Sequence, residues 1–261
     1  MIVSTDAWRS HVAHVLTSSN EHVNPRGMPT LEIIGPSVSI DMETPIVLCK
    51  IRKLNYGFMF GEASWILDGS NDLLAIEPYM NRIKYYSDNS RILSGAYGPH
   101  IVRQLQYVCR TLRHDRDSRQ AVISIWQERP ETSKDIPCTL TMQFIIRNDH
   151  IHCIVNMRSS DVYLGLPYDL FTFSCVAARV RDMLGIRKLK LGTLSVHAGS
   201  AHVYKRDFAK AVNSCMNVNN PKLYPEPQKF DVPPHGFDIN ARHGILAELA
   251  RVIEAGNYGN S

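Results

Sequence analysis

Residues 158–169 read RSSDVYLGLPYD, a polar stretch that joins two segments of different character. The segment before it, residues 151–158, is rich in strand-forming side chains, which predicts a β-strand. The segment after it, residues 170–184, is apolar over most of a helix circumference, which predicts a buried helix. Because Arg158, Asp161 and Asp169 interrupt this apolar framework, the junction is the first candidate for a functional site.

Outward from this junction, predicted helices alternate with long strands. Residues 140–147 and 151–158 are expected to form a hairpin, because Asn148-Asp149 supplies a tight turn between them. Further strands are predicted over residues 30–35, 121–126 and 190–204, and further helices from residue 4, over 58–67, over 101–112 and near 245–254. This mixture, with mostly non-parallel strands, predicts the α+β class.

The composition is that of an ordinary globular chain. Its 261 residues include 29 Lys and Arg against 25 Asp and Glu, a net charge of +4, and 44% of them are hydrophobic. This balance argues against disorder and against a nucleic-acid binder with a strongly basic surface. The length fits one large domain or two small ones, and we expect a single domain over residues 1–261.

Membrane and metal-binding signals are both missing from the sequence. No apolar run reaches the ~18–20 residues of a membrane helix. The N-terminus also lacks a signal-peptide core, so we expect no membrane partner and a cytoplasmic location. The six cysteines are scattered without zinc-site spacing, which predicts free thiols and no metal.

Taken singly, the polar residues have ordinary structural explanations. Cys138 follows Pro137 in a turn, where a cysteine can serve as a small buried hydrophobe. Arg158 and Asp161 would form a surface ion pair, and Asp169 would be the N-cap of the helix that follows it. It is their occurrence together that favours a functional site.

Together these residues resemble the thymidylate synthase family. The resemblance rests on Pro137-Cys138 followed by the block 158–169, and it spans roughly residues 26–210. Four further motifs agree in order and spacing: residues 61–69 (GEASWILDG), Tyr97-Gly98, residues 115–119 (DRDSR) and residues 199–204 (GSAHVY). The resemblance implies a single domain with a large, mostly antiparallel or mixed sheet packed against helices. It also implies a homodimer whose interface is formed by one side of the sheet.

The resemblance assigns the nucleophile and the phosphate ligands. A pyrimidine becomes reactive at C5 only after a nucleophile adds at C6, and a thiolate is the best protein group for that addition. Cys138 takes this role. A free thiol has a pKa of about 8.5, and Arg158 is expected to lower it while gripping the phosphate. Arg26 and Arg119 would be further phosphate ligands, Arg119 arriving from the other subunit.

The other motif residues would bind the sugar and the folate and move protons. The substrate implied is a pyrimidine nucleotide monophosphate, and the co-substrate is 5,10-methylenetetrahydrofolate. By resemblance, proton transfer falls to Tyr97 and to a water held by Glu62; the folate is bound by Asp161, Gly165 and Glu62; the substrate by Ser159, Ser160 and Asp161; and the sugar hydroxyl by His202 and Tyr204.

The position that contacts the base departs from the family pattern. Thymidylate synthases have asparagine at the position of Asp169, whose amide accepts from uracil N3–H and donates to O4. Cytosine has an amino group at C4 and an acceptor at N3, so a carboxyl that accepts from the amino group and shares a proton with N3 is the better complement. Asp169 therefore predicts a cytosine nucleotide. The phage deoxycytidylate hydroxymethylases carry the same aspartate, and residues 30–35 also resemble the corresponding segment of those enzymes.

Further departures concern the fate of the exocyclic methylene intermediate. Thymidylate synthases close the site for hydride transfer with an apolar tail and a tryptophan. Here residues 254–261 are polar and glycine-rich, and residues 82–86 hold no tryptophan. A wetter site favours attack by water, which predicts a deoxycytidylate 5-hydroxymethyltransferase. Gln120 and Thr139 replace a usual arginine and histidine, and Gln120 puts one phosphate contact in question.

Several alternatives remain open at this point. The product could be a methyl group, which would make the chain a dCMP 5-methyltransferase. The substrate could be CMP rather than the favoured dCMP, as in the hydroxymethylases of nucleoside-antibiotic pathways. From another class, the chain could be a non-catalytic pyrimidine-nucleotide or RNA-binding relative, although such a protein needs no nucleophile.

Overall fold

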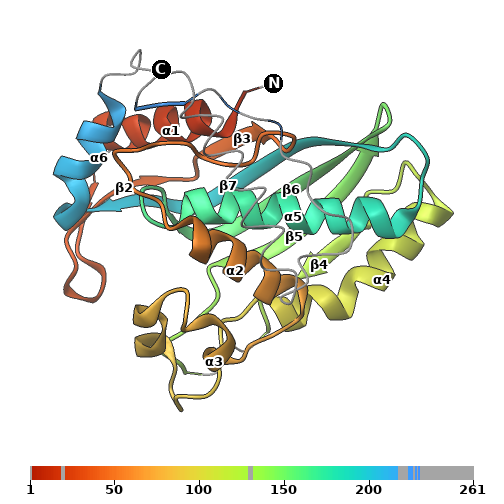
Figure 1. The fold of residues 1–261 in the computed structure, drawn as a ribbon, viewed down its shortest axis with the longest axis horizontal. Helices are drawn as coiled ribbons and strands as arrows, with labels where there is room; N and C mark the ends of the chain where they lie inside the picture. The colour runs from red at the N-terminus through yellow and green to blue at the C-terminus, as the bar shows by residue number, and fades with distance from the viewer. Residues whose placement is uncertain are drawn as a thin grey trace, which may run out of the picture.

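A seven-stranded mixed sheet is the framework on which the helices pack (Figure 1). The computed structural model describes residues 2–18, 21–128, 132–216, 223–225, 227 and 229. The strands are β1 (Glu21–Val23), β2 (Thr30–Ile34), β3 (Ser37–Asp41), β4 (Val122–Ser124), β5 (Thr139–Arg147), β6 (His150–Asp161) and β7 (Lys190–Tyr204). They lie in the order β1-β2-β7-β6-β5-β4, and β3 also pairs with β7. The sheet and its helices confirm the predicted α+β class.

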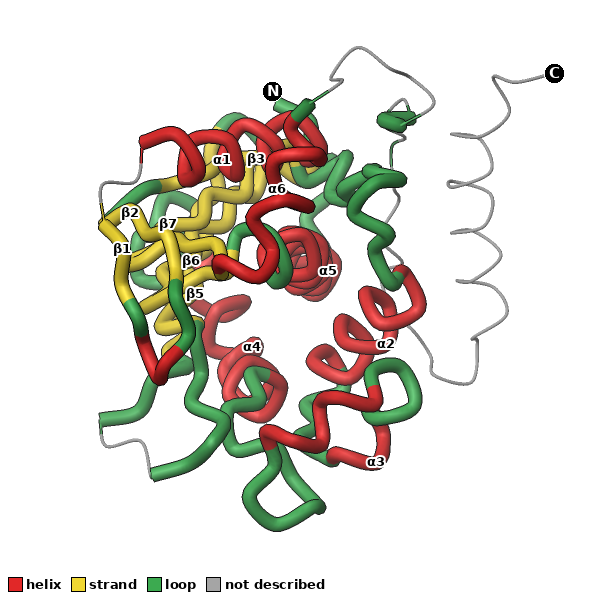
Figure 2. The backbone as a smooth tube through the Cα atoms, turned by 90° about the vertical axis from the view of Figure 1, so that its left-hand side faces the viewer, coloured by secondary structure: helices red, strands yellow, loops and turns green. Residues whose placement is uncertain are grey.

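The helices include every one predicted within the described residues. They are α1 (Ser4–Ser18), α2 (Tyr56–Leu67), α3 (Leu73–Ile76), α4 (Gly98–His114), α5 (Leu166–Leu184) and α6 (Phe208–Cys215), with 3-10 turns at Pro25–Gly27, Asn81–Tyr86 and Lys205–Asp207. Figure 2 shows α2, α4 and α5 together on one side of the sheet. The helix predicted near residues 245–254 lies outside the described residues.

The β5–β6 hairpin forms as the sequence predicts. Its strands are antiparallel, and Arg147 pairs with His150 across the turn. Asn148 and Asp149 have φ values of 50° and 56°, the left-handed conformation that a tight two-residue hairpin turn requires. The turn places the start of β5, next to Cys138, beside the end of β6, next to Arg158.

Helix α5 is the crossover between two parallel strands. β6 and β7 pair in parallel, so the chain must cross over between them, and α5 makes this connection. The helix packs on β6 and β7 and is flanked by α2 and α4, so its middle residues have almost no exposed surface. Gly185, with φ 65°, ends it. The first turn of α5, which carries Asp169, is therefore held rigidly at the end of the sheet.

The opposite face of the sheet carries partly exposed side chains. Along β6, buried residues alternate with His152, Ile154 and Asn156, which retain solvent exposure. The dimer interface expected on this side of the sheet stays a prediction. Among the described residues, no helix combines the length and the apolarity needed to cross a bilayer.

Candidate active site

Cys138 lies immediately before β5, against the end of β6. The backbone N–H of Arg158 donates to the carbonyl of Cys138 at 2.8 Å, which ties the two strand ends together. The hydroxyl of Ser159 donates to the Cys138 sulfur at 3.7 Å. Cys138 is half-buried, so a reactant can still approach a thiol that the sheet holds in place.

The pKa of the Cys138 thiol is raised, which differs from the expectation that Arg158 lowers it. Burial is the largest cause, because it disfavours the thiolate. The charge of Arg158 and the hydrogen bond from Ser159 do lower this pKa, but the charges of Asp169 and Asp135 oppose them. The charge of Arg158 therefore lowers the thiol pKa as expected, but burial and the two carboxylates raise it by more. In the free protein the thiol form dominates at neutral pH.

The guanidinium of Arg158 makes three hydrogen bonds, two of them to the segment just before Cys138. Nε donates to the carbonyl of Pro137 at 2.9 Å, Nη2 to that of Ile136 at 2.9 Å, and Nη1 to the Ser159 hydroxyl at 3.2 Å. Among the described residues Arg158 makes no ion pair with Asp161, so the simple surface pair is not what forms. Arg158 remains exposed, and an anion can reach it.

Two neighbouring carboxyl groups have raised pKa values, and the charge of one of them, Asp169, acts on Cys138. Glu62 projects from α2 and Asp169 from the first turn of α5, and these helices pack together. Burial and the charge of Asp169 raise the pKa of Glu62 to about 8. Burial and the charge of Asp161 raise the pKa of Asp169 to about 7. Glu62 therefore largely keeps its proton at neutral pH, and Asp169 is close to half-protonated there.

Asp169 is not the N-cap of its helix. Gly165 occupies that position, and its amide donates to the carbonyl of Asp161 at 3.0 Å. The Asp169 side chain makes no hydrogen bond to the described part of the chain. A carboxyl this strongly desolvated and without a partner is free to bind a ligand.

Tyr97 completes the group around Cys138. It precedes α4 and is half-buried. Burial raises its pKa far above the usual range, with further increases from the charges of Asp169, Cys138 and Glu62. The fold thus brings together Cys138, Tyr97, Glu62 and Asp169, which the sequence separates widely.

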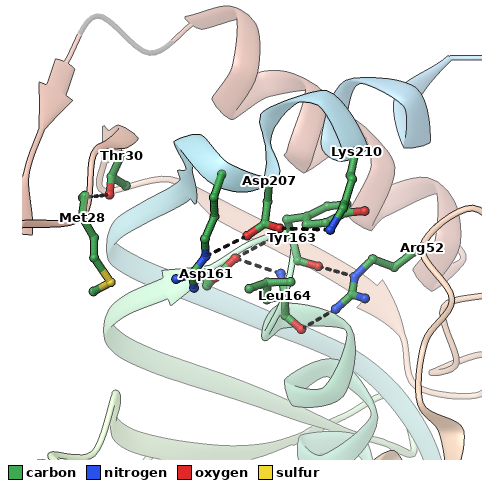
Figure 3. Close-up of polar contacts among 9 residues, drawn as sticks. Met28, Thr30, Arg52, Asp161, Tyr163, Leu164, Asp207 and Lys210 are labelled. Atoms are coloured by element: carbon green, nitrogen blue, oxygen red, sulfur yellow. Dashed lines mark hydrogen bonds and ion pairs between the residues drawn. The ribbon is translucent and has the colours of Figure 1, made fainter. Parts of the chain in front are cut away.

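Asp161 is held by the backbone of the turn that follows β6 (Figure 3). Its Oδ1 accepts from the amides of Tyr163 at 3.1 Å and Leu164 at 2.8 Å. Burial is the largest cause that raises the pKa of Asp161 to about 6, and the charge of Asp207 adds to it. One carboxylate oxygen thus fixes the turn, while the other makes no hydrogen bond within the described chain.

Arg52 and Asp207 enclose this turn from two other parts of the chain. Arg52 donates to the carbonyls of Tyr163 at 2.9 Å and Leu164 at 3.2 Å, and its guanidinium stacks over the Tyr163 ring at 4.9 Å. Asp207 is buried and ion-paired with Arg206 and Lys210. Figure 3 shows these groups gathered around Asp161. The turn is therefore held from the loop before α2 by Arg52, while the like charge of Asp207 lies near enough to raise the pKa of Asp161.

The residues expected to bind sugar and phosphate form a second group. His202 and Tyr204 lie at the end of β7, with their rings edge to face at 5.1 Å. Burial raises the pKa of Tyr204, and the charge of Arg26 lowers it in part. Arg26 and Arg158 both lower the pKa of His202, in which burial is the largest effect. Two cations and a histidine thus lie close together, which suits an anionic phosphate.

Three predicted site residues have less direct placements. Arg119 is exposed after α4, and its side chain makes no hydrogen bond or ion pair in the described part of the chain. The Ser160 hydroxyl is buried and lacks a hydrogen-bond partner among the described residues. Gly165 acts in the turn through its backbone. Their substrate, cofactor and partner roles stay predictions.

Four charged residues near the site escaped the sequence analysis. Each works through long-range contacts: Asp135 bonds Gly95, 40 positions away, and Glu32 bonds Ser200, 168 positions away. Arg52 and Asp207 also act on a turn distant in sequence. The sequence shows each of them only as a charged residue among apolar neighbours, and this pattern does not indicate which distant residue it contacts.

A thiol at a strand end, beside a proton-bearing carboxyl pair and a cationic group, suits covalent catalysis on a phosphorylated electrophile. The family model described as thymidylate synthase matches residues 6–231, and the chain belongs to the thymidylate synthase family. The protein is therefore a transferase of nucleotide metabolism that acts at C5 of a pyrimidine nucleotide, and the family uses methylenetetrahydrofolate as co-substrate. The match begins within α1, earlier than the motifs that carry the sequence resemblance.

Proposed function

We propose that the protein is a folate-dependent cytidylate 5-hydroxymethylase that favours dCMP over CMP. The observation that carries this proposal is Asp169, a desolvated carboxyl without a protein partner and with a pKa raised to about 7. Such a group accepts from the C4 amino group of cytosine and shares its proton with N3. An asparagine at this position has no titratable proton to transfer to N3.

The reaction needs a nucleophile and controlled proton transfer. The Cys138 thiolate adds to C6, and the resulting carbanion at C5 bonds to the one-carbon unit supplied by methylenetetrahydrofolate. The C5 proton then leaves, tetrahydrofolate departs, and water adds to the exocyclic methylene before C6 releases the thiolate. Tyr97 and the protonated Glu62, with its pKa raised to about 8, are the groups for these transfers.

The residues present also suit a folate. Asp161 keeps one carboxylate oxygen free of hydrogen bonds within the described chain, since its Oδ1 alone holds the turn. A carboxylate oxygen is a suitable acceptor for the N–H groups of a pterin ring. Asp161 would hold and orient that ring beside the nucleotide. The folate supplies the one-carbon unit when bound.

A homodimer is part of the proposal. Arg119 is exposed, and its side chain makes no hydrogen bond or ion pair within the described residues. The sheet face opposite α5 also keeps partly exposed side chains. An isologous dimer through that face would let Arg119 serve the phosphate site of the other copy. The cytoplasmic location expected from the sequence stays a proposal as well.

The decisive experiment is incubation with methylenetetrahydrofolate and each of dCMP, CMP and dUMP, followed by mass analysis of the nucleotide and a dihydrofolate assay. We expect a hydroxymethyl product from dCMP without dihydrofolate. Dihydrofolate formed in step with a methylated nucleotide would support the methyltransferase instead. Faster turnover of CMP would reassign the sugar, faster turnover of dUMP would overturn the base assignment, and binding without product would favour a non-catalytic relative.

A further inference from the structure

Asp135 lies three residues before the nucleophile and bonds to the segment that carries Tyr97. Its Oδ2 accepts from the backbone N–H of Gly95 at 2.8 Å. Gly95 in turn lies two residues before Tyr97. Asp135 therefore links the two segments through one charged hydrogen bond, from a position where it is only partly exposed.

The close approach of these segments requires glycine at position 95. A Cβ added there would lie 2.8 Å from Oδ1 of Asp135 and 2.9 Å from its backbone oxygen. Real Cβ atoms do not approach that closely, so an alanine would push the two segments apart. The requirement for glycine and the hydrogen bond are separate observations, and both bring the segments together at the same point.

The segment that contains Asp135 is tied down at a second point. The carboxyl of Asp88 accepts from the amide of Lys134 at 3.2 Å and from the Ser133 hydroxyl. Ser133 in turn accepts from the amide of Asp135 at 3.0 Å. Asp88 thus holds the same segment from outside, without being among the charges that act on Cys138.

We propose that Asp135 is a positioning residue that keeps the nucleophile Cys138 and the proton-transfer residue Tyr97 in register through the amide of Gly95. The proposal rests on the proposed function for the roles of Cys138 and Tyr97. Mutual placement of reacting groups governs rate strongly, since a displacement of ~1 Å can cost a hundredfold. The hydrogen bond joins Gly95, two residues before Tyr97, to Asp135, three residues before Cys138. Its loss should therefore move both groups.

The charge of Asp135 gives this role a second signature. The groups that act on the Cys138 thiol are Arg158 and Ser159, which lower its pKa, and Asp169 and Asp135, which raise it along with burial. Tyr97 also interacts with the thiol electrostatically. Replacing Asp135 with asparagine keeps an acceptor for Gly95 and removes one of the two opposing charges. A purely structural residue would not shift the pH profile of a neighbouring thiol.

The test compares Asp135→Asn, Asp135→Ala, Gly95→Ala and the control Asp88→Asn in two assays on the full chain. The first is turnover, and the second is the pH profile of Cys138 alkylation by iodoacetamide in the free enzyme. We expect Asp135→Ala and Gly95→Ala to lose roughly tenfold or more in kcat, and Asp135→Asn to keep most of it. We expect the alkylation profile of Asp135→Asn to move to lower pH and that of Asp88→Asn to stay in place.

Two results would overturn the proposal. One is an Asp135→Asn kcat as low as that of Asp135→Ala in variants with wild-type thermal unfolding, and the other is an Asp135→Ala enzyme with wild-type kcat. An equal alkylation shift in Asp88→Asn would remove the specific charge effect. Should Asp135→Ala fail to fold, the comparison of Gly95→Ala with Asp135→Asn decides. Because alkylation needs no substrate, its result stands even if cytidylate proves not to be the substrate.

Discussion

Glu62 on α2 and Asp169 on α5 lie close enough that the charge of Asp169, added to burial, raises the pKa of Glu62 to about 8. Asp169 is subject to the same effect from Asp161, and its own pKa is raised to about 7. Ionising one member of such a cluster makes the next ionisation harder. The site consequently retains protons at a pH where isolated carboxyl groups would have lost them.

Binding of dCMP should weaken above pH 7. If Asp169 shares a proton with cytosine N3, that proton is already bound below a pKa of about 7 and must be taken up above it. The apparent Kd should then rise by up to about tenfold per pH unit on the alkaline side. Calorimetric titration between pH 6 and pH 9 measures this, with Asp169→Asn as the matched variant. Asp169→Asn should lose the dependence and shift preference toward dUMP; identical slopes in the two proteins would contradict the shared proton.

Replacing Glu62 with glutamine should stabilise the fold at alkaline pH while abolishing turnover. The native state keeps a proton on Glu62 that the unfolded chain releases above pH ~4.5, so wild-type stability falls as pH rises from there to about 8. Glu62→Gln removes that loss, with a gain of roughly 2–4 kcal/mol at pH 9. Urea unfolding at pH 5 and pH 9 tests it, with the exposed Glu128→Gln as control. A pH-independent difference between Glu62→Gln and wild type would show that Glu62 ionises normally.

Removing the Ser159 hydroxyl should make Cys138 less reactive. That hydroxyl donates to the sulfur and lowers a thiol pKa that burial has raised. A hydrogen bond of ~1 kcal/mol predicts alkylation of Ser159→Ala about threefold to fivefold slower at pH 7.5. Ser160→Ala is the matched control, because its hydroxyl makes no hydrogen bond among the described residues. Cys138→Ser, which should lose turnover, identifies the labelled thiol, and equal rates in Ser159→Ala and wild type would remove Ser159 from thiol activation.

Two inactive variants should restore activity when they are co-expressed. Arg119→Ala lacks the arginine proposed to cross the interface, and Cys138→Ser lacks the nucleophile. In a mixed dimer one of the two sites regains both groups, so random assortment returns about a quarter of the wild-type sites. The assay is turnover of the co-expressed protein against each variant alone, with sedimentation to establish the dimer. No recovery from a confirmed mixed dimer would place Arg119 outside the phosphate site of the other subunit.

Local sequence patterns predicted most elements because their signals are short-range. The hairpin follows from Asn148-Asp149, and β7 runs over the predicted residues 190–204. The junction was harder, because its polar residues belong to two elements. β6 continues through Asp161, held by pairing with β7, and α5 begins at Leu166, with Pro167 in its first turn, where proline is well tolerated. The short helix α3 has too few residues for a periodic signal.

The clustering of the candidate site residues was predictable, and their pKa values were less so. The identities of Cys138 and Asp169 came from a family pattern, which also implied their proximity. The raised pKa of Cys138 depends on burial, and burial depends on elements that the residue meets only in the folded chain. For the same reason the ion-paired Asp207, next to Asp161, had no local signature.

The pairing of β7 has a consequence for how ligand binding is divided between rigid and mobile parts. β7 is hydrogen-bonded along one edge by β6 and along the other by β3 and then β2. Amides in so central a strand exchange with solvent only in the rarest, near-global openings. His202, which pairs with Asp161 on one side and Glu32 on the other, therefore lies in a firmly held part of the sheet, and Tyr204 follows two residues later. Arg26, exposed in a single 3-10 turn and with φ 52°, belongs to a segment that opens at low cost. If these residues bind the nucleotide as proposed, the entropy lost on binding falls largely on Arg26, and His202 and Tyr204 beneath the sugar contribute little.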